Sequence, residues 1–177
     1  DAFDAGAAVQ EKDFGVRGFY GASPDYSATE STEDRLFLGS WRRELAEPGD
    51  SVRLTGSARE FGDEYVLDER DPGYYRNRHR TRASSAAADG RLSDGEALAL
   101  TWRLWAEDER IDSRGRSRGN PTAGLGEHDR QRLGTLLLPE YRMDDLTLRC
   151  GGQSVLFSDA APEVLGLAGA EYRAGLR

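Results

Sequence analysis

The chain has 177 residues, a formal net charge of -8 and a hydrophobic fraction of 37%, which fits one domain with a lean core and a tail. Its single cysteine, Cys150, excludes an intrachain disulfide framework, and the net negative charge opposes binding to nucleic acid. No run approaches the ~18 apolar residues of a membrane helix and the N-terminus lacks a signal-peptide layout, so we expect a soluble chain without a membrane span. The sequence does not indicate a compartment.

Residues 1–34 have the composition of an extension rather than of a core element. They are rich in alanine, glycine, aspartate and serine, with one aromatic patch in FGVRGFYG. We therefore expect an N-terminal arm over residues 1–34, held by its own domain or by a partner, and a single β-rich domain over residues 35–177.

Short apolar runs follow from Leu36 onward at intervals of about ten residues, separated by turn signals. Regular short strands at this spacing predict a mainly β fold. The expected architecture is an antiparallel meander that is closed as a small barrel or folded as a sandwich, with long polar loops. The last stretch admits one short helix beginning near Pro162 and then an edge strand.

The segment LGSWRREL resembles the Gly-x-Trp motif on the first strand of lipocalin-like barrels, with Gly39 and Trp41 at the two specified positions. The resemblance implies a cavity for a small hydrophobic molecule. The aromatic residues that could line it with Trp41 are Tyr65, Tyr75, Trp102 and Trp105. The alternative is that all five are ordinary core residues.

Four arginines alternate with other residues in YYRNRHRTR, namely Arg76, Arg78, Arg80 and Arg82. The turn residues at 71–73 predict that this segment forms a hairpin with DEYVLDER. The preferred register, from a three-residue loop, opposes Glu64 to Arg80 and leaves Arg78 and Arg82 without acidic partners. A two-residue loop is the alternative. The row is a solvated polar face, an interface with an acidic protein partner or, against the net charge, a nucleic-acid site.

A second arginine row lies in the glycine-rich segment SRGRSRGNP and consists of Arg114, Arg116 and Arg118. This composition predicts a mobile basic loop. Both rows are candidate contacts for a protein partner.

Residues 93–112 carry two conflicting signals. Ser93 and Glu96 form a capping-box pattern that favours a helix, whereas the strict alternation of Leu98, Leu100 and Trp102 favours a strand. We expect a strand, because the surrounding segments are β.

The segment DDLTLRCGGQSVLFS predicts a hairpin with Gly151 and Gly152 in a two-residue turn. Such a hairpin collects Leu146, Leu148 and Cys150 on one apolar face, where the cysteine would be a buried small hydrophobe.

The sequence contains no recognisable catalytic constellation, and we predict no catalytic residue, cofactor or metal site. His79 is expected on the core side of its strand as a structural histidine. His128 has Glu127 and Asp129 beside it, but adjacent loop residues do not converge on one metal ion.

These observations favour a non-enzymatic structural or binding subunit of a larger protein assembly, such as a virion or a secreted complex. The N-terminal arm and the arginine-bearing loops would contact its neighbours or further copies of the chain. The alternative is a lipocalin-like barrel that binds or converts a small hydrophobic molecule.

Overall fold

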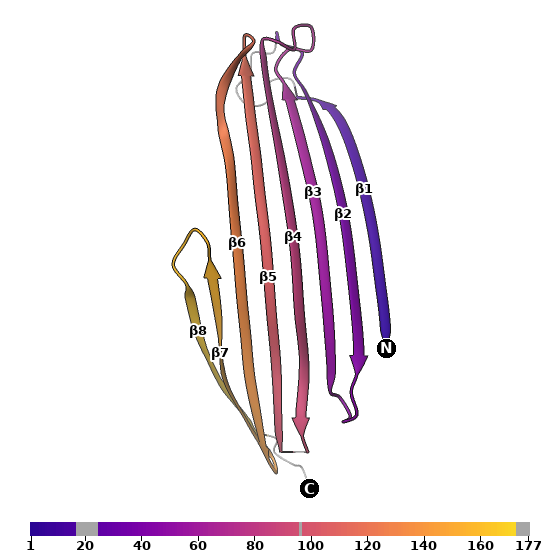
Figure 1. Ribbon diagram of the computed structural model, residues 1–177, viewed down its shortest axis with the longest axis vertical. Coiled ribbons are helices and arrows are strands. Elements are labelled where there is room, and N and C mark those ends of the chain that lie inside the picture. The colour runs from indigo at the N-terminus through magenta and orange to yellow at the C-terminus, as the bar shows by residue number, and fades with distance from the viewer. Residues whose placement is uncertain (17–24, 96, 173–177) are drawn as a thin grey trace.

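The computed structural model describes residues 1–16, 25–95 and 97–172. Within them the chain forms one antiparallel sheet of eight strands, ordered as in the sequence (Figure 1). The strands are β1 (Ala2–Gly15), β2 (Thr29–Glu44), β3 (Ser51–Val66), β4 (Tyr75–Asp94), β5 (Leu98–Ser117), β6 (Asn120–Met143), β7 (Leu146–Phe157) and β8 (Glu163–Tyr172). The predicted all-β antiparallel meander is confirmed.

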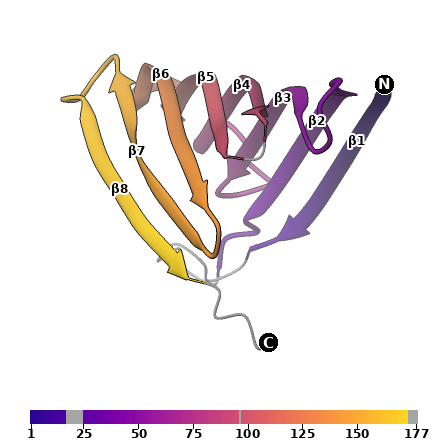
Figure 2. The same cartoon turned by 90° about the horizontal axis from the view of Figure 1, so that it is seen from below.

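The sheet is open. It curves into a trough with β1 and β8 at the two ends of the arc, and these two strands do not pair with each other (Figure 2). The predicted closure into a small barrel or a sandwich is therefore absent, because the described residues form a single layer. Residues after Pro162 form β8 rather than a short helix. No helix in the described part of the chain could cross a lipid bilayer.

The two faces of the sheet differ in exposure along β6. Side chains alternate between the faces along a strand, and residues paired in register share a face. On β6, Leu133, Leu137 and Tyr141 are about half exposed, whereas Glu140, which points the other way, is 7% exposed. Side chains converge on the inner side of a curved sheet and splay apart on its outer side. The face that carries Glu140 is therefore the concave face.

The expected N-terminal arm contributes to this sheet. Residues 2–15 form β1, which pairs along its whole length with β2, and residues 29–34 begin β2. The side chains of β1 are exposed throughout. The part of residues 1–34 that the structure describes thus supplies one edge of the sheet.

Of the ambiguous residues 93–112, those at 93–94 and 98–112 lie in strands and a turn at Gly95 and Ala97 separates them, while Glu96 of the capping pattern lies outside the described residues. Ser93 and Asp94 end β4, and the alternating residues from Leu98 onward belong to β5. The strand suggested by the alternating residues forms, rather than the helix suggested by the capping pattern, because β5 is paired on both sides, with β4 and with β6.

The predicted hairpin around Gly151 and Gly152 is wrong. Both glycines lie inside β7, which runs unbroken beside β6 and β8. A Cβ atom on Gly151 would collide with the carbonyl oxygen of Leu137 on β6. The glycine therefore marks a close approach between two strands rather than a turn.

Candidate interaction surfaces of the sheet

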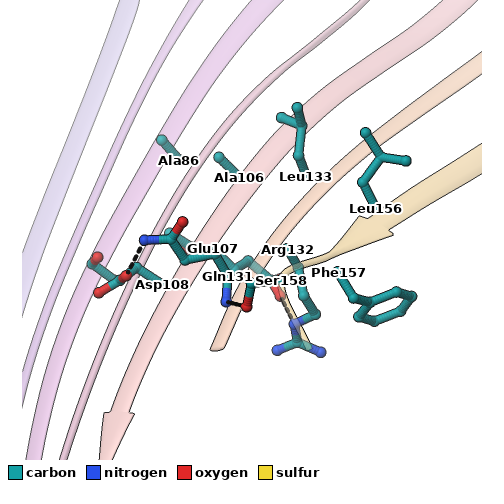
Figure 3. Close-up of a pocket in the computed structure, with 12 residues that line it drawn as sticks. Ala86, Ala106, Glu107, Asp108, Gln131, Arg132, Leu133, Leu156, Phe157 and Ser158 are labelled. Carbon is teal, nitrogen blue, oxygen red and sulfur yellow. Dashed lines mark hydrogen bonds and ion pairs between the residues drawn. The ribbon is translucent and has the colours of Figure 1, made fainter. Parts of the chain in front are cut away.

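An uncharged band crosses the convex face of all eight strands. On β5 it comprises the convex residues of 98–106, and on β6 those of 133–143. The register extends it to the convex residues of 3–9, 37–41, 52–58, 86–92, 146–156 and 164–172. Leucine, alanine, glycine and aromatic residues dominate this apolar band. Ala86, Ala106, Leu133 and Leu156 form one of its rows, which runs from β4 to β7 (Figure 3).

Four aromatic residues of the apolar band lie at one end of the sheet. Phe3 is near the start of β1, Trp41 near the end of β2, Tyr141 near the end of β6, and Tyr172 ends β8. In an antiparallel meander these strand ends meet at the same edge of the sheet. Phe3 and Tyr172 are more than two-thirds exposed. The band is thus bordered at this end by large amphipathic or apolar rings.

A charged zone borders the apolar band toward the opposite end. It comprises the convex residues of 60–64, 76–82, 108–116 and 127–129. The predicted first arginine row is part of it. Arg76 forms an ion pair with Glu64 at 2.7 Å. The carboxylate of Glu60 forms ion pairs with Arg80 at 2.5 Å and with Arg82 at 3.1 Å.

The register differs from both predicted alternatives. Val66 lies opposite Arg76, and Glu64 lies opposite Arg78. The connection between β3 and β4 is longer than three residues. The amide of Leu67 donates to the carbonyl oxygen of Tyr75, so the connection consists of residues 68–74. His79, expected on the side of its strand away from the arginines, does lie there, on the concave face that it shares with Tyr65 and Tyr75. Arg82 has an acidic partner after all, whereas the described residues offer Arg78 no ion pair.

The second arginine row is not a mobile loop. Arg114 and Arg116 belong to β5 and lie opposite Arg78 and Arg76 on the convex face, so the fold merges the two rows. Arg114 is held by Asp112 at 2.8 Å. Arg118 occupies the tight turn before β6 with φ of 50°, and its amide donates to the carbonyl of Tyr74 at 2.8 Å.

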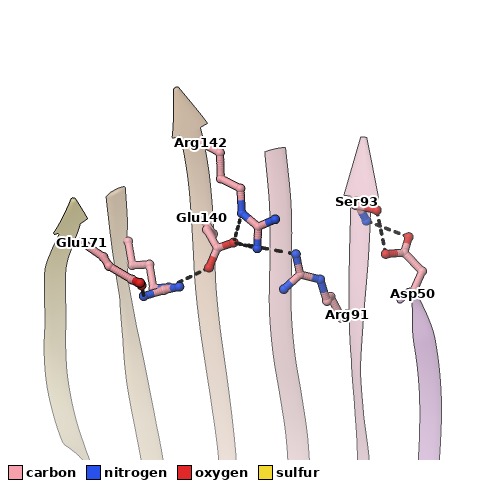
Figure 4. A network of polar contacts seen from close by, with 7 residues as sticks. Asp50, Arg91, Ser93, Glu140, Arg142 and Glu171 are labelled. Atoms are coloured by element: carbon pink, nitrogen blue, oxygen red, sulfur yellow. Dashed lines mark hydrogen bonds and ion pairs between the residues drawn. The ribbon is translucent and has the colours of Figure 1, made fainter. Parts of the chain in front are cut away.

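Glu140 is the centre of a polar network on the concave face (Figure 4). Its carboxylate accepts hydrogen bonds from Arg142 at 2.7 Å and Arg149 at 2.6 Å, and Arg91 approaches it to 3.7 Å. Arg149 also donates to Glu171 on β8. The network therefore ties β4, β6, β7 and β8 together across the concave side.

The environment of Glu140 favours its ionised form. The hydrogen bond from Arg149 lowers the pKa of the Glu140 carboxyl most, and Arg142 lowers it further, against the opposing effect of burial. Ala99 lies opposite Glu140 on β5 and is almost fully buried. Its small side chain leaves room for Arg91 to reach across β5.

Other polar contacts also lie on the concave face or at the strand ends. Glu107 and Arg132 form an ion pair at 2.8 Å between β5 and β6, on the side opposite to Leu133 (Figure 3). Buried Asp50 accepts hydrogen bonds from the amide and hydroxyl of Ser93, both at 2.7 Å (Figure 4). The concave face is thus the polar side of the sheet.

The aromatic residues proposed for a ligand cavity do not share one face. Trp41 and Trp102 belong to the convex face, whereas Tyr65, Tyr75 and Trp105 belong to the concave face. Tyr65 and Tyr75 pack edge to face with ring centroids 6.2 Å apart. Two opposite faces of a single layer cannot line one cavity, so this set does not form the predicted site.

The remaining candidate groups are His79, His128 and Cys150. Within the described residues no group of histidine, cysteine and carboxylate side chains could hold a metal ion. His128 contacts the carbonyl oxygen of Leu125 at 2.5 Å. Asp63 lies opposite His79, and burial raises the pKa of the Asp63 carboxyl. Cys150 is exposed on the convex face, so the prediction that it is buried is wrong.

Sequence reasoning missed the two features that organise these surfaces. The alternation in β5 indicated an apolar face, but nothing local revealed that this face is convex. Glu140 and its three arginines come from three strands, and no sequence spacing connects Arg91 with Arg149.

Comparison of the chain with protein-family models, with curated proteins and with solved structures found no match.

Proposed function

We propose that this chain is a non-enzymatic structural subunit of a larger sheet, joined to its neighbours through the edge strands β1 and β8. The observation that carries the proposal is the open edge on each side of a long antiparallel sheet. Unpaired edge strands present rows of N–H and C=O groups that bind further strands.

The lengths of the edges support pairing. β1 has 14 residues and β8 has 10, and neither contains a proline. Natural sheets protect such long edges with short strands, prolines, bulges, charged side chains or a covering element. Within the described residues, β1 carries charged side chains at Asp4 and at 11–13, and the outer edges of β1 and β8 show none of the other devices.

The directions of the edge strands also suit assembly. β1 and β8 run in opposite directions (Figure 1). A neighbour's β8 can therefore lie against β1 in the same antiparallel arrangement that orders the rest of the sheet. The expected N-terminal arm keeps its proposed role as a contact, but it would act as a pairing strand.

Cross-linking tests this pairing. The variant Ala7→Cys/Ala168→Cys, made with Cys150→Ser, places one thiol on each edge strand and both on the convex face. A short bismaleimide should join separate copies into dimers and longer products. The matched control Ala7→Cys/Ala86→Cys, also made with Cys150→Ser, places the second thiol on β4, whose two sides are already paired, and should give no more product than Ala7→Cys with Cys150→Ser.

Light scattering on the same samples measures the assembled mass. A strictly monomeric chain whose edge cysteines link no better than the control would contradict the proposal.

A further inference from the structure

We propose that the apolar band contacts the hydrocarbon interior of a lipid bilayer, while the concave face is turned toward water. The inference rests on the proposed function, because hydrocarbon cannot satisfy the backbone groups of unpaired edges and the sheet must be completed by neighbouring strands.

The direction of the curvature is the first argument. A curved sheet that folds in water encloses its apolar side chains on the concave side and exposes polar ones outside. Here the order is reversed, since Glu140 and its arginines occupy the concave face and Leu104, Leu133 and Leu137 stand half exposed on the convex face. An apolar medium against the convex face and water against the concave face match the side chains that each face carries.

The height of the band is the second argument. A strand tilted by about 45° crosses the hydrocarbon core with about 9–11 residues. The band occupies residues 98–106 on β5 and 133–143 on β6, which are segments of this length. Beyond them the strands continue into the charged zone, where a row such as Arg82, Arg110 and Asp129 requires water or lipid headgroups.

The borders of the band are the third argument. Trp and Tyr concentrate where hydrocarbon meets the headgroups, because one end of each ring is apolar and the other is polar. Trp41, Tyr141 and Tyr172 stand at one border of the band, and the charged zone begins at the other. Within residues 133–143 of β6 no convex side chain is charged.

A second protein layer is the competing occupant of the convex face. It would have to follow the outside of the arc over all eight strands, from Phe3 on β1 to Tyr172 on β8. The band offers many glycines and alanines among its larger side chains, as fluid hydrocarbon tolerates, rather than a few large anchors in one place. These features favour lipid.

The three tryptophans of the chain provide the test, because Trp41 and Trp102 are convex and Trp105 is concave. Trp41→Phe/Trp105→Phe keeps only Trp102, and Trp41→Phe/Trp102→Phe keeps only Trp105. Each full-length variant is folded into phosphatidylcholine vesicles and into vesicles whose acyl chains are brominated near their centre. Bromine quenches tryptophan only on close approach.

We expect Trp102 to lose most of its emission in brominated vesicles and Trp105 to keep nearly all of it. Single Trp102→Phe and Trp105→Phe replacements give a second reading if a double variant fails to fold, since the first should lower the quenched fraction and the second raise it. Equal quenching of both residues, or none, would overturn the lipid assignment. Cross-links between edge strands without quenching would support the assembly and overturn the lipid contact. Quenching without edge cross-links would support the lipid contact and show that something other than further copies of this chain completes the edges.

Discussion

Replacing Glu140 with glutamine should lower the free energy of unfolding by about 1.5–3 kcal/mol, because it removes a nearly buried carboxylate that accepts charged hydrogen bonds from two partly exposed arginines. Glu140 is 7% exposed and accepts from both Arg142 and Arg149. Denaturant titration of the two proteins in the same vesicles or buffer measures the difference. Glu64→Gln is the matched control, because it removes a carboxylate that pairs with one arginine, Arg76, on the exposed convex face. It should have a much smaller effect.

The effect of Glu140→Gln should depend on pH in one direction. The arginines lower the pKa of the Glu140 carboxyl in the folded protein, so the ionised group stabilises the fold above the ordinary carboxyl pKa of about 4.3. That contribution is lost as the pH falls through the lowered folded-state value. The stability difference between the two proteins should therefore be constant near neutral pH and shrink in acid. A difference that grows in acid would show that the network does not hold Glu140 ionised.

Replacing Leu104 with arginine should cost about 1–3 kcal/mol in vesicles, because Leu104 lies between the centre of the apolar band and its border with the charged zone, where the cost of a cation falls. In water the same change should be nearly neutral, because Leu104 is 49% exposed and surface substitutions rarely change stability much. A stability loss in vesicles that is absent in water indicates contact of Leu104 with lipid, whereas ordinary packing of Leu104 would give a loss in both media.

Leu38→Arg is the matched control for Leu104→Arg. Leu38 is a leucine of similar exposure, 52%, but it lies on the concave face of β2. Its replacement should have little effect in either medium. Equal losses for the two variants in vesicles, measured by denaturant titration, would mean that the two faces meet the same surroundings.

The antiparallel meander could be predicted from the sequence because its signals are local. The alternating residues of β5 and the turn residues before β4 each report on the chain within about ten residues of themselves. The division of Tyr75, His79 and the arginines between two faces followed from the same period of two.

The openness and the inverted faces could not be predicted in this way. Only every second residue of a strand belongs to the apolar band, so the band leaves no long apolar run in the sequence. A search for membrane helices, which looks for such runs, could not detect the band. Gly151 and Gly152 read as a turn, although both lie inside β7 and Gly151 lets β6 and β7 approach closely. The Glu140 network joins β4 to β7 across β5, a relation that exists only once the register is set.

A nitroxide on β7 shows whether the two faces of this sheet meet opposite surroundings. The native Cys150 carries the label on the convex face, and Cys150→Ala/Gln153→Cys carries it on the concave face of the same strand. Power-saturation EPR in vesicles compares collisions with oxygen, which concentrates in hydrocarbon, against a water-soluble nickel chelate. We expect oxygen to relax the label at 150 and nickel to relax the label at 153. The same preference for nickel at both positions would mean that both faces meet water.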